Sequence, residues 1–234
     1  MLNKLYFKLI IFINLFVYIY FLMSYLLTRN VDLSLPPIIR YCYILLCFFL
    51  SLLIEDNCYD IIDKRLLQAA LFFTTIADFF FIIIESPELG IFIFILVQIT
   101  YIIRHSRVLY LTHLHVKILI VLSSSILFLG FFLRPKGINA KLYYLALLYG
   151  TLLINSLICA LLTLRSKFYY KHSSLMLVFG IFLFFMCDIN VGLYPLISEC
   201  YNIPSLSMTI YYLIWFFYLP SQLLLALSGY RKLK

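Results

Sequence analysis

The chain has 234 residues, of which 65% are hydrophobic and only 12% are charged, and its formal net charge is +8. A soluble globular domain is about 45–50% apolar and about 25% charged, so this composition excludes an ordinary soluble protein and predicts an integral multi-pass membrane protein. The basic residues lie in short segments between long apolar runs, which indicates that they orient the chain in a bilayer and argues against nucleic-acid binding.

Apolar runs recur along the whole chain without a polar linker between them. A membrane-spanning helix needs about 20 apolar residues. Dividing the sequence at charges, Pro and Gly therefore predicts an all-α fold of eight transmembrane helices in one domain, residues 1–234. The predicted spans are residues 5–27, 38–54, 65–84, 89–104, 116–133, 141–164, 174–195 and 208–230. The first run is too long for a signal-peptide core, so we expect a retained span.

Lys and Arg are distributed unevenly over the alternate sides of these spans. Most of the 18 basic residues fall on the side that holds both termini. The other side holds Arg29, Arg40, Arg134, Lys136 and Lys141. Because cytoplasmic loops carry the excess of Lys and Arg, we expect both termini in the cytoplasm, in the plasma membrane of a bacterium or an endomembrane of a eukaryote.

Two carboxylates, Asp78 and Asp188, lie inside predicted spans. An ionisable group at membrane depth costs about 2.5–3.5 kcal/mol on insertion scales, which favours a functional role. The third and seventh spans run in the same direction, and each aspartate lies about 9–10 Å below the outer end of its helix. We therefore expect the two carboxyls to face each other across a polar cavity, one protonated and the other ionised.

The alternative is that each acid is hydrogen-bonded by a nearby polar side chain, such as Thr74, Thr75 or Asn190, and only helps the helices to pack.

Further polar side chains within the spans are candidates for substrate contact. An amide follows each aspartate on the next span, Gln98 after Asp78 and Gln222 after Asp188, which is the pattern expected for a parallel internal repeat. A tyrosine shares a helix face with each amide. The predicted substrate-binding residues are Gln98, Tyr101, Asn155, Asn190, Tyr218 and Gln222. For each amide, a hydrogen bond between helices is the alternative.

The four histidines fall in or beside loops on the basic side, away from the aspartates, so we expect no metal site. They are His105, His113, His115 and His172.

Four stretches together resemble the lysoplasmalogenase family, also called YhhN-like membrane proteins. They are KRLLQAALFFTTIADFFFIII, ELGIFIFILVQITYI, GIFLFFMCDINVGL and YLIWFFYLPSQLLLALSG. The matching residues are Asp78, Gly90, Phe94, Tyr101, Gly180, Phe184, Asp188, Tyr218, Gln222 and Ser228. The chain departs from the family at Ala77 and Cys187, where a small Gly or Ser is common, and at Gln98, where a histidine is common. The first two spans match weakly.

This resemblance implies an eight-span enzyme that hydrolyses the vinyl ether bond of lysoplasmalogens to a fatty aldehyde and a glycerophospho-headgroup. It implies that Asp78 and Asp188 are the catalytic pair, acting on a lysophospholipid among the membrane lipids. Vinyl ether cleavage starts with proton transfer to an alkene carbon and passes through an oxocarbenium-like cation, so two carboxyls suffice and we expect neither metal nor organic cofactor. A proton-coupled transporter or lipid flippase using the same aspartates is the alternative.

Overall fold

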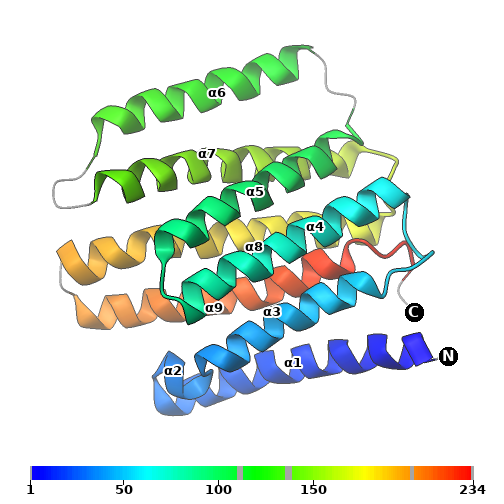
Figure 1. Ribbon diagram of the computed structural model, residues 1–234, viewed down its shortest axis with the longest axis horizontal. Helices are drawn as coiled ribbons and strands as arrows, with labels where there is room; N and C mark the ends of the chain where they lie inside the picture. Colours follow the sequence, from blue (N-terminus) through cyan, green and yellow to red (C-terminus); the bar gives the residue numbers. More distant parts are fainter. Residues whose placement is uncertain (1, 110–112, 135–138, 201–202, 233–234) are drawn as a thin grey trace.

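The computed structural model describes residues 2–109, 113–134, 139–200 and 203–232, and every regular element within these ranges is helical (Figure 1). The elements, in chain order, are α1 (Leu2–Thr28), α2 (Val31–Ser34), α3 (Pro37–Leu52), α4 (Ile61–Asp78), the π-helical segment η1 (Phe79–Ile83), α5 (Pro87–Ser106), α6 (His113–Phe132), α7 (Ala140–Leu162), the short 3₁₀ turn η2 (Thr163–Arg165), α8 (Lys171–Pro195), the π-helical segment η3 (Leu196–Cys200) and α9 (Pro204–Leu227). The predicted all-α fold is confirmed for this part of the chain.

Six helical stretches in the described ranges are long and apolar enough to cross a membrane. They are Asn3–Thr28, Ile61–Ile83, Pro87–Ser106, Ala140–Arg165, Lys171–Ser198 and Pro204–Leu227. Each coincides with a predicted span. The other two predicted spans, 38–54 and 116–133, coincide with shorter apolar helices, Pro37–Leu52 and Leu119–Phe132. The structure therefore supports a multi-pass membrane protein. Six of its described helices are long and apolar enough to cross a membrane, and two further apolar helices are shorter.

Local sequence explains where several helices begin. Proline occupies the first turn of α3, α5 and α9, where its missing N–H costs no helical hydrogen bond. Asn139 caps α7 by accepting hydrogen bonds from the amides of Lys141 and Leu142. Asp60 caps α4 by accepting one from the amide of Asp63. The Asp60 cap fixes the first turn of α4 and so sets the position of Asp63.

Six helices form a closed ring in the order α3, α4, α5, α7, α8 and α9, with α9 returning to α3 (Figure 1). The α8–α9 pair has the most extensive contact of any two helices. Gly180 permits this approach, because a Cβ at that position would lie 2.8 Å from Leu225 Cγ and 3.2 Å from the Leu225 backbone nitrogen. The helices α4 and α8, which carry the two membrane-depth aspartates, are both members of this ring.

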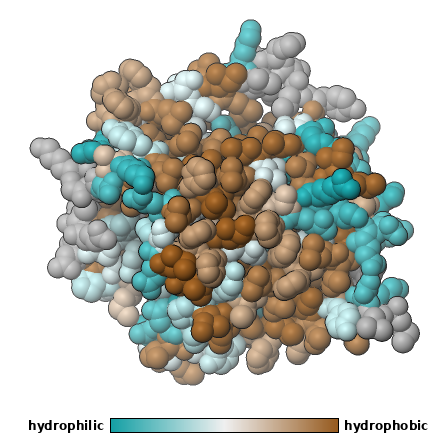
Figure 2. Space-filling view, viewed as in Figure 1, coloured by the Kyte–Doolittle hydropathy of each residue, from teal (hydrophilic) through white to brown (hydrophobic). Residues whose placement is uncertain are grey.

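The helices α1 and α6 lie outside this ring, at opposite edges of the bundle (Figure 1). Their outer faces expose large apolar side chains, among them Phe12 and Phe16 on α1 and Phe128 and Phe132 on α6. Figure 2 shows hydrophobic residues over much of the middle of one face, with hydrophilic residues gathered toward its two ends. This distribution fits a protein whose middle is surrounded by lipid.

Both ends of the described chain lie at one end of the bundle (Figure 1). The side chain of Asn3 donates a hydrogen bond to Glu55, and the amide of Arg231 donates one of 2.9 Å to the Asn57 carbonyl. The segment between α3 and α4 therefore contacts both ends.

Candidate functional site

Asp78 is the last residue of α4 and is 4% exposed. The hydroxyl of Tyr218, on α9, donates a hydrogen bond of 2.5 Å to its Oδ2 atom. The π-helical segment η1 begins at the next residue, Phe79. Such π-helical turns are rare and frequently occur at functional sites, since they re-aim the side chains around them. The local backbone and the tyrosine together fix this carboxyl inside the helix ring.

Asp188 has the corresponding arrangement on α8. It is partly buried, and the hydroxyl of Tyr149, on α7, donates a hydrogen bond of 2.6 Å to its Oδ2 atom. The amide nitrogen of Gln98, on α5, lies 3.4 Å from the same hydroxyl oxygen. Three helices of the ring therefore meet at Asp188 through one tyrosine.

Phenylalanine rings fill the space between the tyrosines. The Phe94 ring lies 6.0 Å from that of Tyr149 and 5.8 Å from that of Phe184, and the Phe184 ring lies 5.6 Å from that of Tyr218, measured between centroids. A row of packed aromatic rings thus connects the two tyrosine–aspartate pairs.

The structure connects Gln98 and Tyr218 to the aspartates and gives other partners to most of the remaining predicted site residues. Gln222 donates to the Ser221 hydroxyl at 3.3 Å, and Asn190 donates to the Met186 carbonyl one turn earlier at 2.7 Å. Asn155 donates to the Ser123 hydroxyl on α6 at 2.8 Å. The Asn155 bond joins two helices, as expected for an amide in a membrane bundle, whereas the Gln222 and Asn190 bonds lie within their own helices.

Tyr101 is fully buried, and its ring stacks on His105 at 5.7 Å between centroids. The threonines offered as packing partners of Asp78 instead bond to their own helix, Thr74 to the Ala70 carbonyl and Thr75 to the Phe72 carbonyl. The hydrogen bond to Asp78 comes from a different helix.

Tyr149 is the site residue that sequence reasoning missed. It is one of 20 tyrosines, and its partner Asp188 lies 39 positions further along the chain. No spacing within one helix indicates a contact of this kind, because it depends on how α7 packs against α8.

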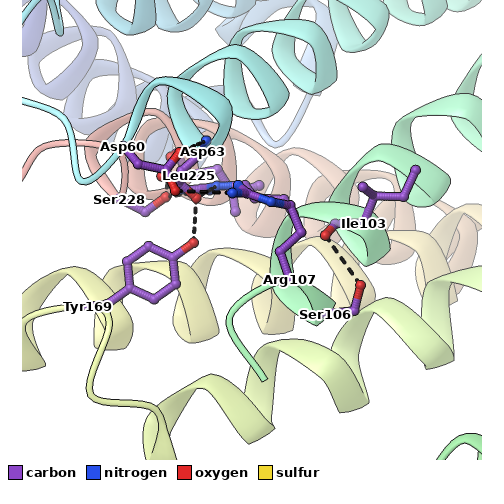
Figure 3. Close-up of polar contacts among 9 residues, drawn as sticks. Asp60, Asp63, Ile103, Ser106, Arg107, Tyr169, Leu225 and Ser228 are labelled. Atoms are coloured by element: carbon purple, nitrogen blue, oxygen red, sulfur yellow. Dashed lines mark hydrogen bonds and ion pairs between the residues drawn. The ribbon is translucent and has the colours of Figure 1, made fainter. Parts of the chain in front are cut away.

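A second buried polar cluster lies near the chain ends, and sequence reasoning missed it as well. The Arg104 side chain, in the last turn of α5, is completely buried against Asp63, also completely buried, in the first turn of α4. Its Nε lies 2.8 Å from Asp63 Oδ1 and its Nη2 lies 3.2 Å from Oδ2, while Nη1 donates to the Ser228 hydroxyl at 3.0 Å. Tyr169 also donates to Asp63, and Figure 3 shows Asp63, Tyr169 and Ser228 converging. Burial raises the pKa of the Tyr169 hydroxyl, which keeps this donor protonated.

The prediction that the basic residues lie in short segments between the apolar runs is therefore wrong at Arg40 and Arg104, while His105 lies next to a loop, as predicted, but is buried. Arg104 and His105 are completely buried at the end of α5, and Arg40 is 2% exposed in α3. The side chains of His113 and His115 lie outside the described residues.

Two hollows flank the Arg104 cluster. One of about 450 Å³ is lined by Leu164, Ser166, Tyr169, Lys171, Ser174 and Leu175. The other, of about 360 Å³, is lined by Asp60, Arg107, Val108, Leu109, Ser166, Lys167 and Phe168. Neither hollow is lined by Asp78 or Asp188.

Comparison of the chain with protein-family models, curated proteins and solved structures finds no match.

Proposed function

We propose that this protein is a membrane-embedded hydrolase that cleaves the vinyl ether bond of lysoplasmalogen-type lipids, giving a fatty aldehyde and a glycerophospho-headgroup. The observation that carries the proposal is geometric: Asp78 and Asp188 each accept a hydrogen bond from a tyrosine on another helix, and the packed rings of Phe94 and Phe184 connect these two tyrosines. The motifs shared with lysoplasmalogenases supply the reaction type and the substrate class.

The chemistry needs one carboxylic acid and one carboxylate. The acid transfers its proton to the alkene carbon that is not bonded to oxygen, and the other alkene carbon becomes an oxocarbenium centre that the carboxylate stabilises. Water then adds to that centre and gives its proton to a carboxylate. The resulting hemiacetal breaks its bond to the glycerol oxygen, which takes a proton from the carboxyl that water protonated and leaves as the headgroup alcohol. The hemiacetal hydroxyl gives its proton to the other carboxylate as the aldehyde carbonyl forms, so both aspartates return to their starting states.

The two tyrosines would position the carboxyls for these steps. Among the described residues, we find hydrogen bonds only to the Oδ2 atom of each aspartate, which leaves Oδ1 for substrate or water. The Phe94 and Phe184 rings pack between the two tyrosines and keep this part of the bundle apolar.

The proposal includes eight membrane crossings with both termini in the cytoplasm. Its support is the even number of long apolar segments, the single end of the bundle at which both chain ends lie and the bias of Lys and Arg toward that side. The 16-residue α3 would be about 24 Å long, somewhat short of the roughly 30 Å hydrocarbon core. We therefore expect the bilayer to thin beside it.

Purified protein should release fatty aldehyde from a lysoplasmenylethanolamine. Asp78→Asn and Asp188→Asn should each lower this release by about 10²- to 10⁴-fold, the range expected for loss of a general acid or base. Asp56→Asn is the matched control, because Asp56 is an exposed aspartate between α3 and α4. Trapped aldehyde, measured by mass spectrometry with ¹⁸O-labelled water, reports both the rate and the source of the carbonyl oxygen.

Aldehyde release at the wild-type rate in both variants would contradict the proposal, as would an inactive wild-type protein. Proton flux driven by lipid in proteoliposomes, without aldehyde, would instead support the transporter or flippase alternative.

A further inference from the structure

A second arginine site lies at the end of the bundle away from the chain termini. Arg40, in the first turn of α3, is 2% exposed. Its Nη1 donates to the Tyr211 hydroxyl at 2.7 Å and its Nη2 lies 2.5 Å from Asp32 Oδ1, on the short helix α2. Among the described residues, the buried Nε has no hydrogen-bond partner. The guanidinium is therefore only partly satisfied.

Trp215, on α9, adds a second donor to the same place. The Arg40 Cζ atom lies 4.5 Å from the centre of the Trp215 ring, within the range of a cation–π contact. The indole nitrogen of Trp215 is also buried without a partner among the described residues. Burying an N–H group without a hydrogen bond is costly, so two such donors on contacting groups need an explanation.

The chemistry of these donors selects an anion. A guanidinium and an indole N–H can donate hydrogen bonds but accept none. Arginine favours phosphate oxygens, which can accept from two of its nitrogens at once. The carboxylate of Asp32 already occupies one side of the guanidinium, and its side chain is 59% exposed. An anion arriving from outside the bundle can therefore displace Asp32 without opening the core.

This site adjoins Asp78. The rings of Trp215 and Tyr218 are 5.9 Å apart in an edge-to-face contact, and Tyr218 donates to Asp78. Tyr41, next to Arg40, lies 6.0 Å from the ring of Phe79, which directly follows Asp78. In a lysoplasmalogen, the glycerol backbone separates the phosphate from the vinyl ether, so a phosphate at Arg40 would place the vinyl ether toward Asp78.

We propose that Arg40 and Trp215 bind the phosphate of the lysophospholipid headgroup, and that Asp32 occupies the guanidinium when no lipid is bound. This inference rests on the proposed function for its choice of a lysophospholipid over other phosphate carriers. The phosphate site orients the lipid, and the aspartates act on its ether end.

Trp215 is the only tryptophan in the sequence, so its intrinsic fluorescence reports on this site directly. Protein in a maltoside detergent is titrated with a saturated 1-O-alkyl lysophosphocholine, which contains no vinyl ether and is not cleaved. Parallel titrations use 1-O-alkylglycerol of the same chain length, which lacks the phosphate, and inorganic phosphate. We expect saturable binding of the lysophospholipid, with the alkylglycerol binding about 10- to 100-fold more weakly.

Two variants change this affinity in opposite directions. Arg40→Gln should weaken lysophospholipid binding about 10- to 100-fold without changing alkylglycerol binding. Asp32→Asn should strengthen lysophospholipid binding about two- to fivefold, because the competing carboxylate is gone. If Arg40→Gln does not fold, Asp32→Asn still decides the question, since a purely structural Arg40–Asp32 pair predicts no gain in affinity.

Equal affinity for the two lipids, or unchanged or weaker lysophospholipid binding in Asp32→Asn, would overturn the inference. Binding of inorganic phosphate as tight as that of the lysophospholipid would assign the site to free phosphate and overturn the lipid assignment. Because the probe is not cleaved, these results are independent of aldehyde release, so the binding site and the hydrolase can fail separately.

Discussion

The two buried arginines, Arg104 and Arg40, lie at opposite ends of the bundle and differ in how completely they are paired. All three guanidinium nitrogens of Arg104 bind Asp63 or Ser228, and both side chains of that ion pair are fully buried. Arg40 keeps one buried nitrogen without a partner in the described chain, and its carboxylate partner is largely exposed. A saturated pair has a structural role, since it offers nothing to a ligand, whereas an unsaturated one can exchange its partner.

The same contrast separates the acidic residues. Asp63 is neutralised by an arginine, so its charge has a full partner inside the bundle. Within the described ranges, Asp78 and Asp188 each accept a hydrogen bond from one neutral tyrosine hydroxyl and from no other group. A carboxyl without a cation can exchange a proton with a substrate at lower cost. This difference fits a structural role for Asp63 and the catalytic role that we propose for Asp78 and Asp188.

Arg104→Met gives the largest stability change that we expect. It leaves the Asp63 charge buried and unpaired, which should lower the free energy of unfolding by about 3–5 kcal/mol. The double variant Asp63→Leu/Arg104→Met should recover more than half of that loss, because it removes both charges together. Unfolding of the purified protein in detergent, followed by circular dichroism, measures both effects. Wild-type stability in the single variant would show that the Arg104–Asp63 ion pair does not stabilise the protein.

The parts of the fold that depend on sequence alone were predictable. The apolar runs predicted every long helix of the described chain, and the cost of a charge at membrane depth identified Asp78 and Asp188 before any geometry was known. The sequence failed to predict that two of the basic residues, Arg40 and Arg104, are buried within helices. Arg104 follows an apolar run, as a loop residue would, and its burial depends on Asp63, 41 positions earlier, on the neighbouring helix.

Helix pairing also decides which polar groups reach the aspartates. Tyr218 was predictable as a candidate because it shares a face with Gln222, yet the structure shows it bonded to Asp78 on α4. Tyr149 had no comparable signal. Asn155 was a reasonable candidate from its polarity, but it bonds to Ser123 of the outer helix α6. The spacing of residues in the sequence shows which side chains share a helix face. It does not show which other helix packs against that face, because this depends on how all the helices pack together.

Tyr218→Phe and Tyr149→Phe should have an intermediate effect, on activity more than on stability. Each removes one hydrogen bond to a carboxyl, worth about 1.5–3 kcal/mol when the acceptor is charged, so aldehyde release should fall by about 10- to 100-fold. Tyr43→Phe is the control, because this buried hydroxyl has no partner among the described residues. A fall that is equal in all three variants would indicate a packing effect and contradict a role in positioning the aspartates.

The smallest effect is expected at Arg107, which repeats the Arg104 arrangement one helical turn further along. Arg107 Nη2 lies 3.1 Å from Asp60 Oδ2, but these side chains are 30% and 34% exposed (Figure 3). Arg107→Met should therefore cost less than about 1 kcal/mol, in contrast to Arg104→Met. A loss as large as that of Arg104→Met would show that burial is not what separates the two pairs.

The pH dependence of stability tests the Arg107–Asp60 pair separately. Burial raises the pKa of Asp60, but hydrogen bonds from the Asp63 backbone and from Arg107 outweigh it and leave the pKa below its ordinary value. A lowered folded-state pKa means that ionised Asp60 stabilises the protein above its unfolded-state pKa of about 4, and that this contribution is lost as the pH falls through the folded-state value.

Arg107→Met removes one cause of the lowered pKa, so stability measured from neutral pH to about pH 3 should fall less steeply than in the wild type. The Asp63 amide still donates its hydrogen bond to the Asp60 carboxylate in that variant, so part of the slope should remain. An unchanged slope would mean that the helix cap alone lowers the pKa of Asp60, and that Arg107 does not contribute to this shift.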